Sequence, residues 1–131
     1  MEPAFKDIPA LFLYDFPASM AALAVIDESR TPPVAQRWEL YLYGIEVANT
    51  YTELTDREEH RRRFEEWNHY RQTHGLPVYP EDREFLDAVA KLPPCAGCAM
   101  GLERLLMGLT RRDEISFFRL FPDEPRRPSI P

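Results

Sequence analysis

Thirteen prolines divide this chain of 131 residues into short segments. Proline ends a helix and has no amide hydrogen to give to an interior strand, so helices and strands are expected to end near these positions. Most prolines fall in groups, at residues 32–33, 77–80 and 93–94 and in the last ten positions. The length favours one domain with a sizeable core, and a content of 44% hydrophobic residues is typical of a globular protein.

Four strands are expected between these breaks. Residues 11–16 form an apolar run that predicts a buried strand ended by Pro17. Residues 37–43 alternate and predict a second strand, Gly44 interrupts it, and residues 45–54 predict a third. The small residues at 95–101 predict the last strand. The segments between them are expected to be a loop or short helix at 18–24 and a polar loop at 27–34.

Three helices are expected in the second half of the chain. Thr55 and Glu58 have the spacing of a capping box and Gly75 is typical of a helix end, so a helix is predicted between them. A shorter helix is predicted over residues 82–91 and another after Gly101. The inward-facing residues of that last helix are expected to be Leu102, Leu105, Leu106 and Leu109. Strands joined by short turns, with helices on one side, predict an α+β fold with an antiparallel sheet.

Charge and sorting signals limit the classes of function. The net charge of −6 argues against a general nucleic-acid coat, since phosphate binding needs a surplus of lysine and arginine. Residues 1–7 lack the basic stretch of a signal peptide. A membrane-spanning helix needs about 18 consecutive apolar residues, and no apolar run in the sequence approaches that length. Two cysteines are no disulfide framework. The sequence therefore predicts a cytoplasmic protein that does not enter a membrane.

Three weaker signals favour structural roles. Cys95 and Cys98 have the spacing of a redox pair or of half a zinc site, but the histidines do not complete a zinc pattern. The basic run at residues 61–63 is flanked by glutamates, which favours a salt-bridged helix face over a nucleic-acid surface. Trp38 and Trp67 are expected in the core.

Three carboxylates lie seven residues apart on the predicted sheet, at Glu39, Glu46 and Glu53. In one unbroken strand the first two would face opposite ways, but a turn or bulge at Gly44 brings both to one face. Two such carboxylates bind Mg²⁺ well only when substrate phosphates supply further oxygens. The alternative is that all three are solvent-facing glutamates on edge strands.

Residues 97–104 combine small residues with one cation. Glycines let a backbone or a flat ligand approach closely, and Arg104 is expected one turn into a helix, near its positive end, which suits a phosphate. The segment is neither a P-loop nor a dinucleotide fingerprint. The alternative is tight packing of a strand on a helix with a surface arginine.

Together these segments resemble the class II lysyl-tRNA synthetases. The first is residues 37–39 with residues 44–56, GIEVANTYTELTD, and the second is residues 97–104, GCAMGLER, which is similar to their motif 3. The resemblance is closer to the truncated paralogues that attach lysine or β-lysine to elongation factor P. Residues 16–24, FPASMAALA, match their characteristic segment, and Ala99 stands where the tRNA synthetases usually carry glycine. The resemblance covers roughly residues 9–121 and implies the C-terminal half of a class II catalytic domain.

The resemblance also implies roles for single residues. Glu39 and Glu46 match the pair that holds Mg²⁺ and ATP, and Arg104 matches the motif 3 arginine on the γ-phosphate, so Glu46 and Arg104 are the expected catalytic residues. Gly101 would leave room for adenine. The expected lysine-binding residues are Asn49, Tyr51, Glu53, Gly97 and Ala99. Glu53 would take the ε-ammonium group, and the methyl group of Ala99 would reshape the pocket in a way that the paralogues associate with β-lysine.

The implied chemistry has two steps, adenylate formation from ATP and transfer of the acyl group to a lysine of elongation factor P, or to the end of tRNA in the synthetases. Motifs 1 and 2 of the family are not found in residues 1–36. Residues 1–121 are therefore expected to be part of a catalytic domain, with a mobile, Pro-rich tail at 122–131. Half of an antiparallel sheet favours a homo-oligomer. A fragment of a lysyl-tRNA synthetase that charges tRNA(Lys) and a non-catalytic binding module remain as alternatives.

Overall fold

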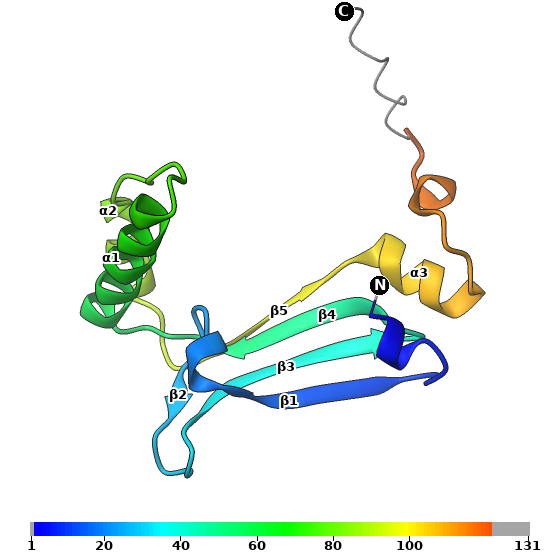
Figure 1. Ribbon diagram of the computed structural model, residues 1–131, viewed down its shortest axis with the longest axis horizontal. Coiled ribbons are helices and arrows are strands. Elements are labelled where there is room, and N and C mark those ends of the chain that lie inside the picture. Colours follow the sequence, from blue (N-terminus) through cyan, green and yellow to red (C-terminus); the bar gives the residue numbers. More distant parts are fainter. Residues whose placement is uncertain (1, 122–131) are drawn as a thin grey trace, which may run out of the picture. The chain divides into compact units, whose positions relative to one another are not determined.

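A computed structural model describes residues 2–121, so the expected tail lies outside the described part of the chain. The described residues divide into two compact units, one made of residues 2–14, 38–49 and 98–121 and the other of residues 15–37 and 50–97. The elements in chain order (Figure 1) are η1 (Pro3–Phe5), β1 (Leu11–Pro17), η2 (Ala18–Met20), β2 (Ile26–Asp27), β3 (Val34–Leu42), β4 (Ile45–Thr52), α1 (Arg57–Thr73), α2 (Arg83–Val89), β5 (Ala96–Met100), α3 (Leu102–Thr110) and η3 (Ile115–Phe118).

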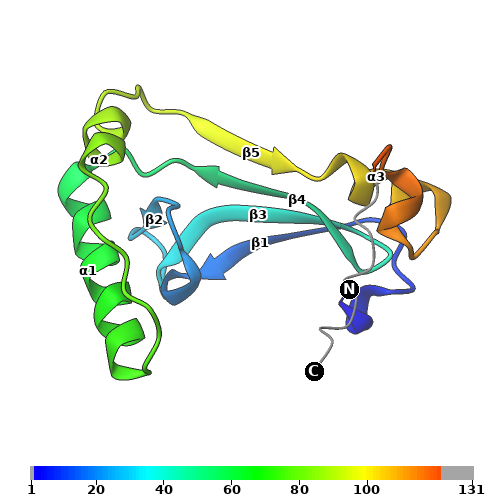
Figure 2. The same cartoon turned by 90° about the horizontal axis from the view of Figure 1, so that it is seen from above.

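The strands form one sheet in the order β1-β3-β4-β5, with β2 paired to β3 in antiparallel register (Figure 2). A two-residue turn, Tyr43–Gly44, joins β3 to β4. Both turn residues have positive φ, 48° and 76°, as hairpin turns of this length require. A side chain at Gly44 would also lie 2.5 Å from the carbonyl oxygen of Glu2. The antiparallel sheet with its helices confirms the predicted α+β fold.

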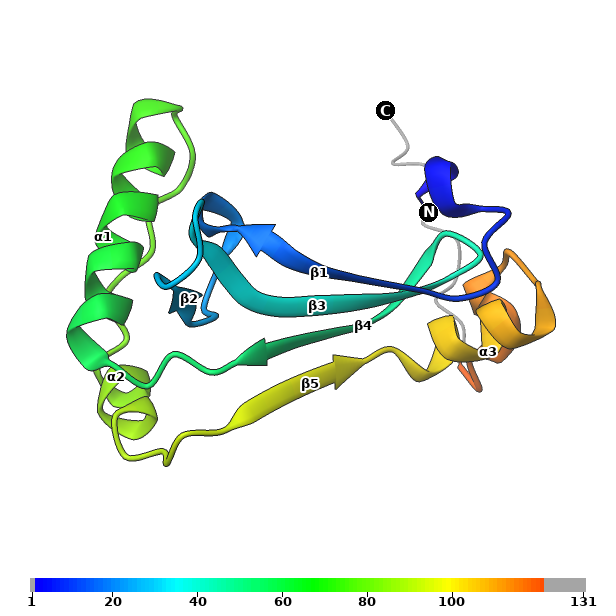
Figure 3. The same cartoon turned by 90° about the horizontal axis from the view of Figure 1, so that it is seen from below.

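The first unit has a small core under the hairpin. Ile45, Val47 and Met107 are buried there, with Leu105 of α3 packed against them. Figure 3 shows α3 beside the turn end of the β3–β4 hairpin. Gly108 permits this approach, because a Cβ atom at this position would lie 2.7 Å from that of Leu42.

The prediction of four inward leucines on α3 is confirmed for Leu105 and wrong for the other three. Leu102, Leu106 and Leu109 are 66%, 43% and 67% exposed. The helix meets the hairpin through Leu105, Met107 and Gly108, which leaves the stripe at positions 102, 106 and 109 uncovered within the described residues.

The second unit contains α1 and α2, which pack against each other. Leu86 and Val89 of α2 are buried, and the ring of Phe85 meets the ring of His60 at a centroid distance of 5.5 Å. The helix cap differs by one residue from the prediction, because Asp56 is the N-cap and accepts the amide hydrogen of Glu59 at 2.8 Å.

Two predictions of burial are also wrong. Trp67 is 59% exposed and stacks on Tyr70 at 5.1 Å instead of entering the core. On β1 only Phe16 is buried, whereas Phe12 and Tyr14 are 56% and 67% exposed. In both elements the sequence shows apolar residues, but nothing in the described part of the chain covers them.

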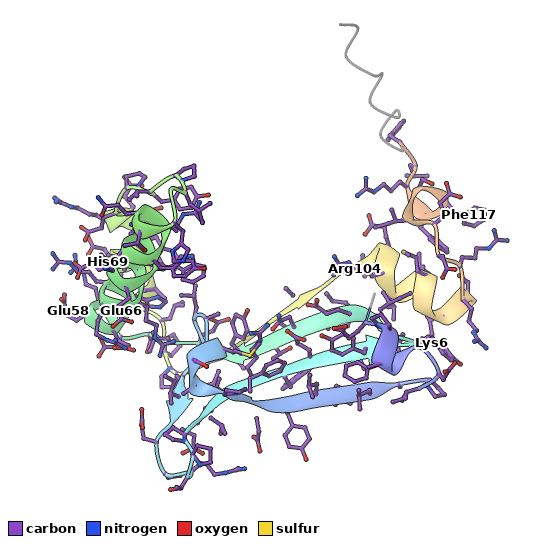
Figure 4. All side chains as sticks on the ribbon, in the orientation of Figure 1. Lys6, Glu58, Glu66, His69, Arg104 and Phe117 are labelled. Carbon is purple, nitrogen blue, oxygen red and sulfur yellow. The ribbon has the colours of Figure 1, made fainter. Side chains whose placement is uncertain are left out.

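The basic run on α1 forms a salt-bridged face, as predicted. Arg61, Arg62 and Arg63 each pair with a glutamate of the same helix. Figure 4 shows Glu58, Glu66 and His69 projecting from α1, and all three are exposed. The arginines are therefore neutralised locally, which removes the main argument for a nucleic-acid surface here.

Glu59 is the centre of this network, and we expect its carboxylate to make the stability of the fold depend on pH. Its carboxylate accepts hydrogen bonds from Arg62 at 2.7 Å and Arg63 at 2.8 Å, and these bonds lower its pKa to about 2 from 4.5. Folding gains stability from this group above pH 4.5 and loses it as the pH falls towards 2. We expect Glu59→Gln to lower the free energy of unfolding at pH 7 by about 1 kcal/mol, after allowance for solvent screening. Urea denaturation at several pH values measures this.

The control for that experiment is Glu65→Gln, which removes one charge from a more exposed position paired only to Arg61 in the contacts described. We expect it to change stability by a few tenths of a kcal/mol. An equal loss in both variants, or a Glu59→Gln variant that keeps the acid sensitivity of the wild type between pH 4.5 and 2, would contradict the assignment.

Candidate functional site

Glu39 is a buried carboxylate in the middle of β3. It is 5% exposed, accepts a hydrogen bond from the Tyr41 hydroxyl at 2.5 Å and receives one from Asn49 Nδ2 at 3.1 Å. Because β3 lies between β1 and β4, the alternative of a solvent-facing glutamate on an edge strand is wrong for this residue. A buried charge needs such partners, since an unpaired one is very costly.

Glu46 and Asn49 of β4 are both half-buried, whereas Val47 and Ala48 between them are buried. The hydrogen bond from Asn49 to Glu39 places position 49 beside the buried carboxylate. The turn at Tyr43–Gly44 reverses the chain between Glu39 and Glu46, and the charges of both carboxylates act on the Tyr41 hydroxyl, which is the arrangement expected of a chain reversal at Gly44.

The hydroxyl of Tyr41 lies in the combined field of both carboxylates. Its pKa is raised well above the usual value of 10, first by burial, then by the hydrogen bond to Glu39 and by the charges of Glu39 and Glu46. Negative charge is thus concentrated at this end of the hairpin. Carboxylate oxygens in such a field are the donors that Mg²⁺ prefers, so the residues fit this ion.

Two carboxylates alone do not complete a magnesium site. Among residues 2–121 no group of three or more histidine, cysteine, aspartate or glutamate side chains is arranged to hold a metal ion. The remaining ligands would have to be water or phosphate oxygens, as the sequence analysis expected.

Arg104 is fixed beside Glu46. It lies in the first turns of α3 (Figure 4), and its Nη1 donates a hydrogen bond to the Glu46 carbonyl oxygen at 3.3 Å and lies 4.0 Å from the Glu46 carboxylate. Gly101 is the N-cap of α3, and its amide hydrogen bonds to the carbonyl oxygen of Val47 at 2.9 Å. The backbone of β4 therefore holds the start of α3, and a half-exposed cation stands next to a carboxylate.

Glu53 and Gly97 form a matched pair in the second unit. The amide of Glu53 donates to the carbonyl oxygen of Cys95 at 3.0 Å, which places the two chain segments side by side. A Cβ atom at Gly97 would overlap Oε1 of Glu53. The Glu53 carboxylate is half-buried and occupies the space that the missing side chain leaves.

Arg37 is a residue that the sequence analysis missed. Its guanidinium lies over the rings of Phe16 and Tyr51, at 4.5 and 5.5 Å from their centroids, and donates to the carbonyl oxygen of Met20 at 3.0 Å. It thereby ties the segment after β1 to the tyrosine of the expected lysine pocket. Arg37 lies in one of the segments that carry the resemblance, but its spacing from Phe16 and Tyr51 did not indicate these contacts, because the aromatic partners come from distant parts of the sequence.

A cavity of about 700 Å³ lies in the second unit between residues 18–23 and α1. Arg37 is part of its lining, whereas Tyr51 and Glu53 are not. This hollow is therefore not the lysine pocket that the sequence analysis expected.

The predicted site residues are divided between the two units. The first unit brings together the expected ATP-binding residues with one expected lysine-binding residue, Asn49. Ala99 is exposed on β5 in the same unit. The second unit contains Tyr51, Glu53 and Gly97, and it brings Glu53 and Gly97 together. Cys95 and Cys98 are both free thiols. None of the helices in the described range 2–121 has the length and apolarity of a membrane span.

Comparison with known proteins gives a consistent result. The family model described as class II tRNA synthetases (D, K and N) matches residues 4–125. A curated relative from Yersinia enterocolitica, named elongation factor P--(R)-beta-lysine ligase, is 45% identical over 118 residues, which are 89% of this chain and 36% of that protein.

Relatives of the same name show similar values. The one from Proteus mirabilis is 47% identical over 112 residues, 85% of this chain and 34% of that protein. The one from Hamiltonella defensa is 42% identical over 125 residues, 95% of this chain and 38% of that protein. The chain thus spans about a third of the length of the curated relatives that it matches.

Proposed function

Because the chain belongs to the family of class II tRNA synthetases (D, K and N), we propose that it forms part of a ligase that activates lysine or β-lysine with ATP and transfers it to elongation factor P. The observation that carries the proposal is the arrangement at the hairpin. A buried carboxylate, Glu39, a second carboxylate, Glu46, and the cation of Arg104 occur together on β3, β4 and the start of α3. Opposite charges fixed side by side are what a magnesium–nucleotide complex requires.

In this proposal the first unit binds ATP. Glu39 and Glu46 would hold Mg²⁺, with nucleotide phosphate oxygens as further ligands, and the ion would supply neutralisation of phosphate charge. Arg104 binds the γ-phosphate and is, with Glu46, the catalytic residue. Gly101 leaves space for adenine in this proposal. A Cβ atom at this position would also crowd the side chain of Arg104, at 3.3 Å from its Cδ.

The second unit would supply the carboxylate for the amino acid. Glu53 pairs with the ε-ammonium group, which needs a negative partner once water is removed. Tyr51 forms an aromatic wall with its ring under Arg37. Gly97 makes room for the Glu53 carboxylate. Asn49 and Ala99 remain candidate substrate-binding residues by the family resemblance.

The chemistry requires no protein nucleophile. An oxygen of the amino-acid carboxylate attacks the α-phosphorus of ATP, and pyrophosphate leaves. The ε-amine of a lysine on elongation factor P then attacks the carbonyl carbon of the adenylate, and AMP leaves. The protein contributes by positioning the reactants and by neutralising charge.

The wider setting belongs to the same proposal. Residues 1–121 act as part of a class II catalytic domain, in the cytoplasm, and self-associate through uncovered apolar surface. In the first unit that surface includes Leu102, Leu106 and Leu109.

Lysine-dependent exchange between ATP and pyrophosphate tests the proposal, with (R)-β-lysine in parallel and calorimetric binding of each ligand to the same sample. We expect binding of lysine or β-lysine in the millimolar to micromolar range, and transfer to elongation factor P where exchange occurs. Acylation of tRNA in place of elongation factor P would favour a synthetase fragment. A folded chain that binds neither amino acid nor ATP would overturn the proposal in favour of a binding module.

A further inference from the structure

His60 is a buried polar side chain that the proposed chemistry does not use. It lies on the first turn of α1, is 1% exposed, and its ring is flanked by the rings of Phe64 and Phe85 at 5.8 and 5.5 Å. Its Nε2 lies 2.5 Å from the carbonyl oxygen of Leu54. A carbonyl oxygen only accepts hydrogen bonds, so Nε2 carries the hydrogen and donates it.

The second ring nitrogen of His60 lacks the hydrogen bond that the first one makes. Nδ1 of His60 is buried and has no hydrogen-bond partner. An unsatisfied buried acceptor destabilises a folded protein, and an apolar residue of similar shape would not carry this cost. Packing alone therefore does not explain why a histidine lies between two phenylalanines. The hydrogen bond from its Nε2 to the Leu54 carbonyl oxygen explains it.

Leu54 directly follows Glu53 and lies beyond the end of β4. Its own amide donates to the carbonyl oxygen of Leu23 at 3.1 Å, and the Glu53 amide donates to Cys95 at 3.0 Å. The backbone on both sides of Glu53 is thus fixed through its amides. His60 fixes the Leu54 carbonyl group, which no strand ladder holds at this point.

We propose that His60 is a positioning residue, which locks the Leu54 peptide from α1 and so holds the Glu53 carboxylate against Gly97, ready for the substrate ammonium group. This inference rests on the proposed role of Glu53 in binding lysine. In this proposal α1 and α2 also contribute to the site, because α1 carries His60 and both helices supply the aromatic side chains that orient its ring.

Two substitutions separate positioning from packing. His60→Gln keeps a donor, because the glutamine Nε2 is as many bonds from Cα as the histidine Nε2. His60→Phe keeps an aromatic ring among Phe64 and Phe85 but has no donor. We expect His60→Phe to weaken lysine binding about tenfold with little change in thermal midpoint. We expect His60→Gln to bind lysine within about threefold of the wild type even if its midpoint falls. Calorimetry and thermal denaturation of the 131-residue chain measure both.

A second readout does not need lysine binding. The ¹⁵N shifts of the two ring nitrogens should report a hydrogen on Nε2 and none on Nδ1. The amides of Glu53 and Leu54 should exchange with solvent faster in His60→Phe and at the wild-type rate in His60→Gln. If the wild type binds no lysine but these exchange rates change as expected, the lysine site is lost and the positioning role stands. Unchanged exchange in His60→Phe, or affinities that merely follow the thermal midpoints, would overturn the inference.

Discussion

Replacing Gly97 with alanine is expected to weaken lysine binding about a hundredfold while the chain stays folded. A methyl group at this position would overlap Oε1 of Glu53, so the carboxylate has to leave the place where it would meet the substrate ammonium group. Losing one partner of a desolvated ion pair costs about 3 kcal/mol, and each 1.4 kcal/mol is a factor of ten in affinity. Gly97 does not have a positive φ, so alanine can adopt its backbone conformation.

The design of this experiment rests on three variants. Glu53→Gln removes the charge without changing the shape and is expected to lose about as much affinity as Gly97→Ala. The double variant should then lose little more than either single one, because both remove the same ion pair. Ala96→Ser adds one atom at the exposed neighbouring position and serves as the control. Full additivity of the two single effects, or a Gly97→Ala variant with wild-type affinity, would show that Glu53 does not bind the ammonium group.

Local patterns in the sequence were sufficient to predict the helices and strands, but not to predict which of their side chains are exposed. Gly44 and Gly75, both with positive φ, are the turn signals that place the β3–β4 hairpin and the end of α1. Trp67 and Leu102 were wrongly expected in the interior, because hydrophobicity indicates that a residue gains from burial and does not tell whether another segment covers it.

The candidate site was predictable as a set of residue types and not as a geometry. The odd spacing of Glu39 and Glu46 indicated a chain reversal or bulge at Gly44, and the structure has a two-residue turn there, but the hydrogen bonds that Tyr41 and Asn49 donate to Glu39 do not follow from the spacing. The contacts of Arg37 and His60 escaped the sequence analysis for a related reason. Each depends on backbone carbonyl groups and aromatic faces that only the folded chain brings near.

Glu46→Gln is expected to weaken the binding of Mg²⁺–ATP by about a hundredfold and that of ATP without Mg²⁺ by less than threefold. The carboxylate would bind the metal ion directly, whereas a neutral amide is a poor ligand for a hard cation. Glu46 suits this test better than Glu39, because glutamine at the buried position 39 would leave Tyr41 or Asn49 without its acceptor and unsettle the fold. Calorimetric titration with and without Mg²⁺ gives both constants. Glu103→Gln, at the start of α3, removes an equal charge from outside the carboxylate pair and serves as the control.

Tyr41 allows the same variant to be checked without nucleotide. The charge of Glu46 is one of the causes that raise the pKa of its hydroxyl, so Glu46→Gln should lower that pKa towards the usual value of 10, whereas Glu103→Gln should leave it unchanged. The ultraviolet absorbance of tyrosinate reports this titration, with Tyr41→Phe to identify the signal. If the Tyr41 pKa falls but the affinity for Mg²⁺–ATP does not, the two carboxylates share a field without sharing a metal ion. A loss of nucleotide affinity that is equal in the two glutamine variants would instead reflect overall charge, and Glu46 would no longer be a candidate ligand.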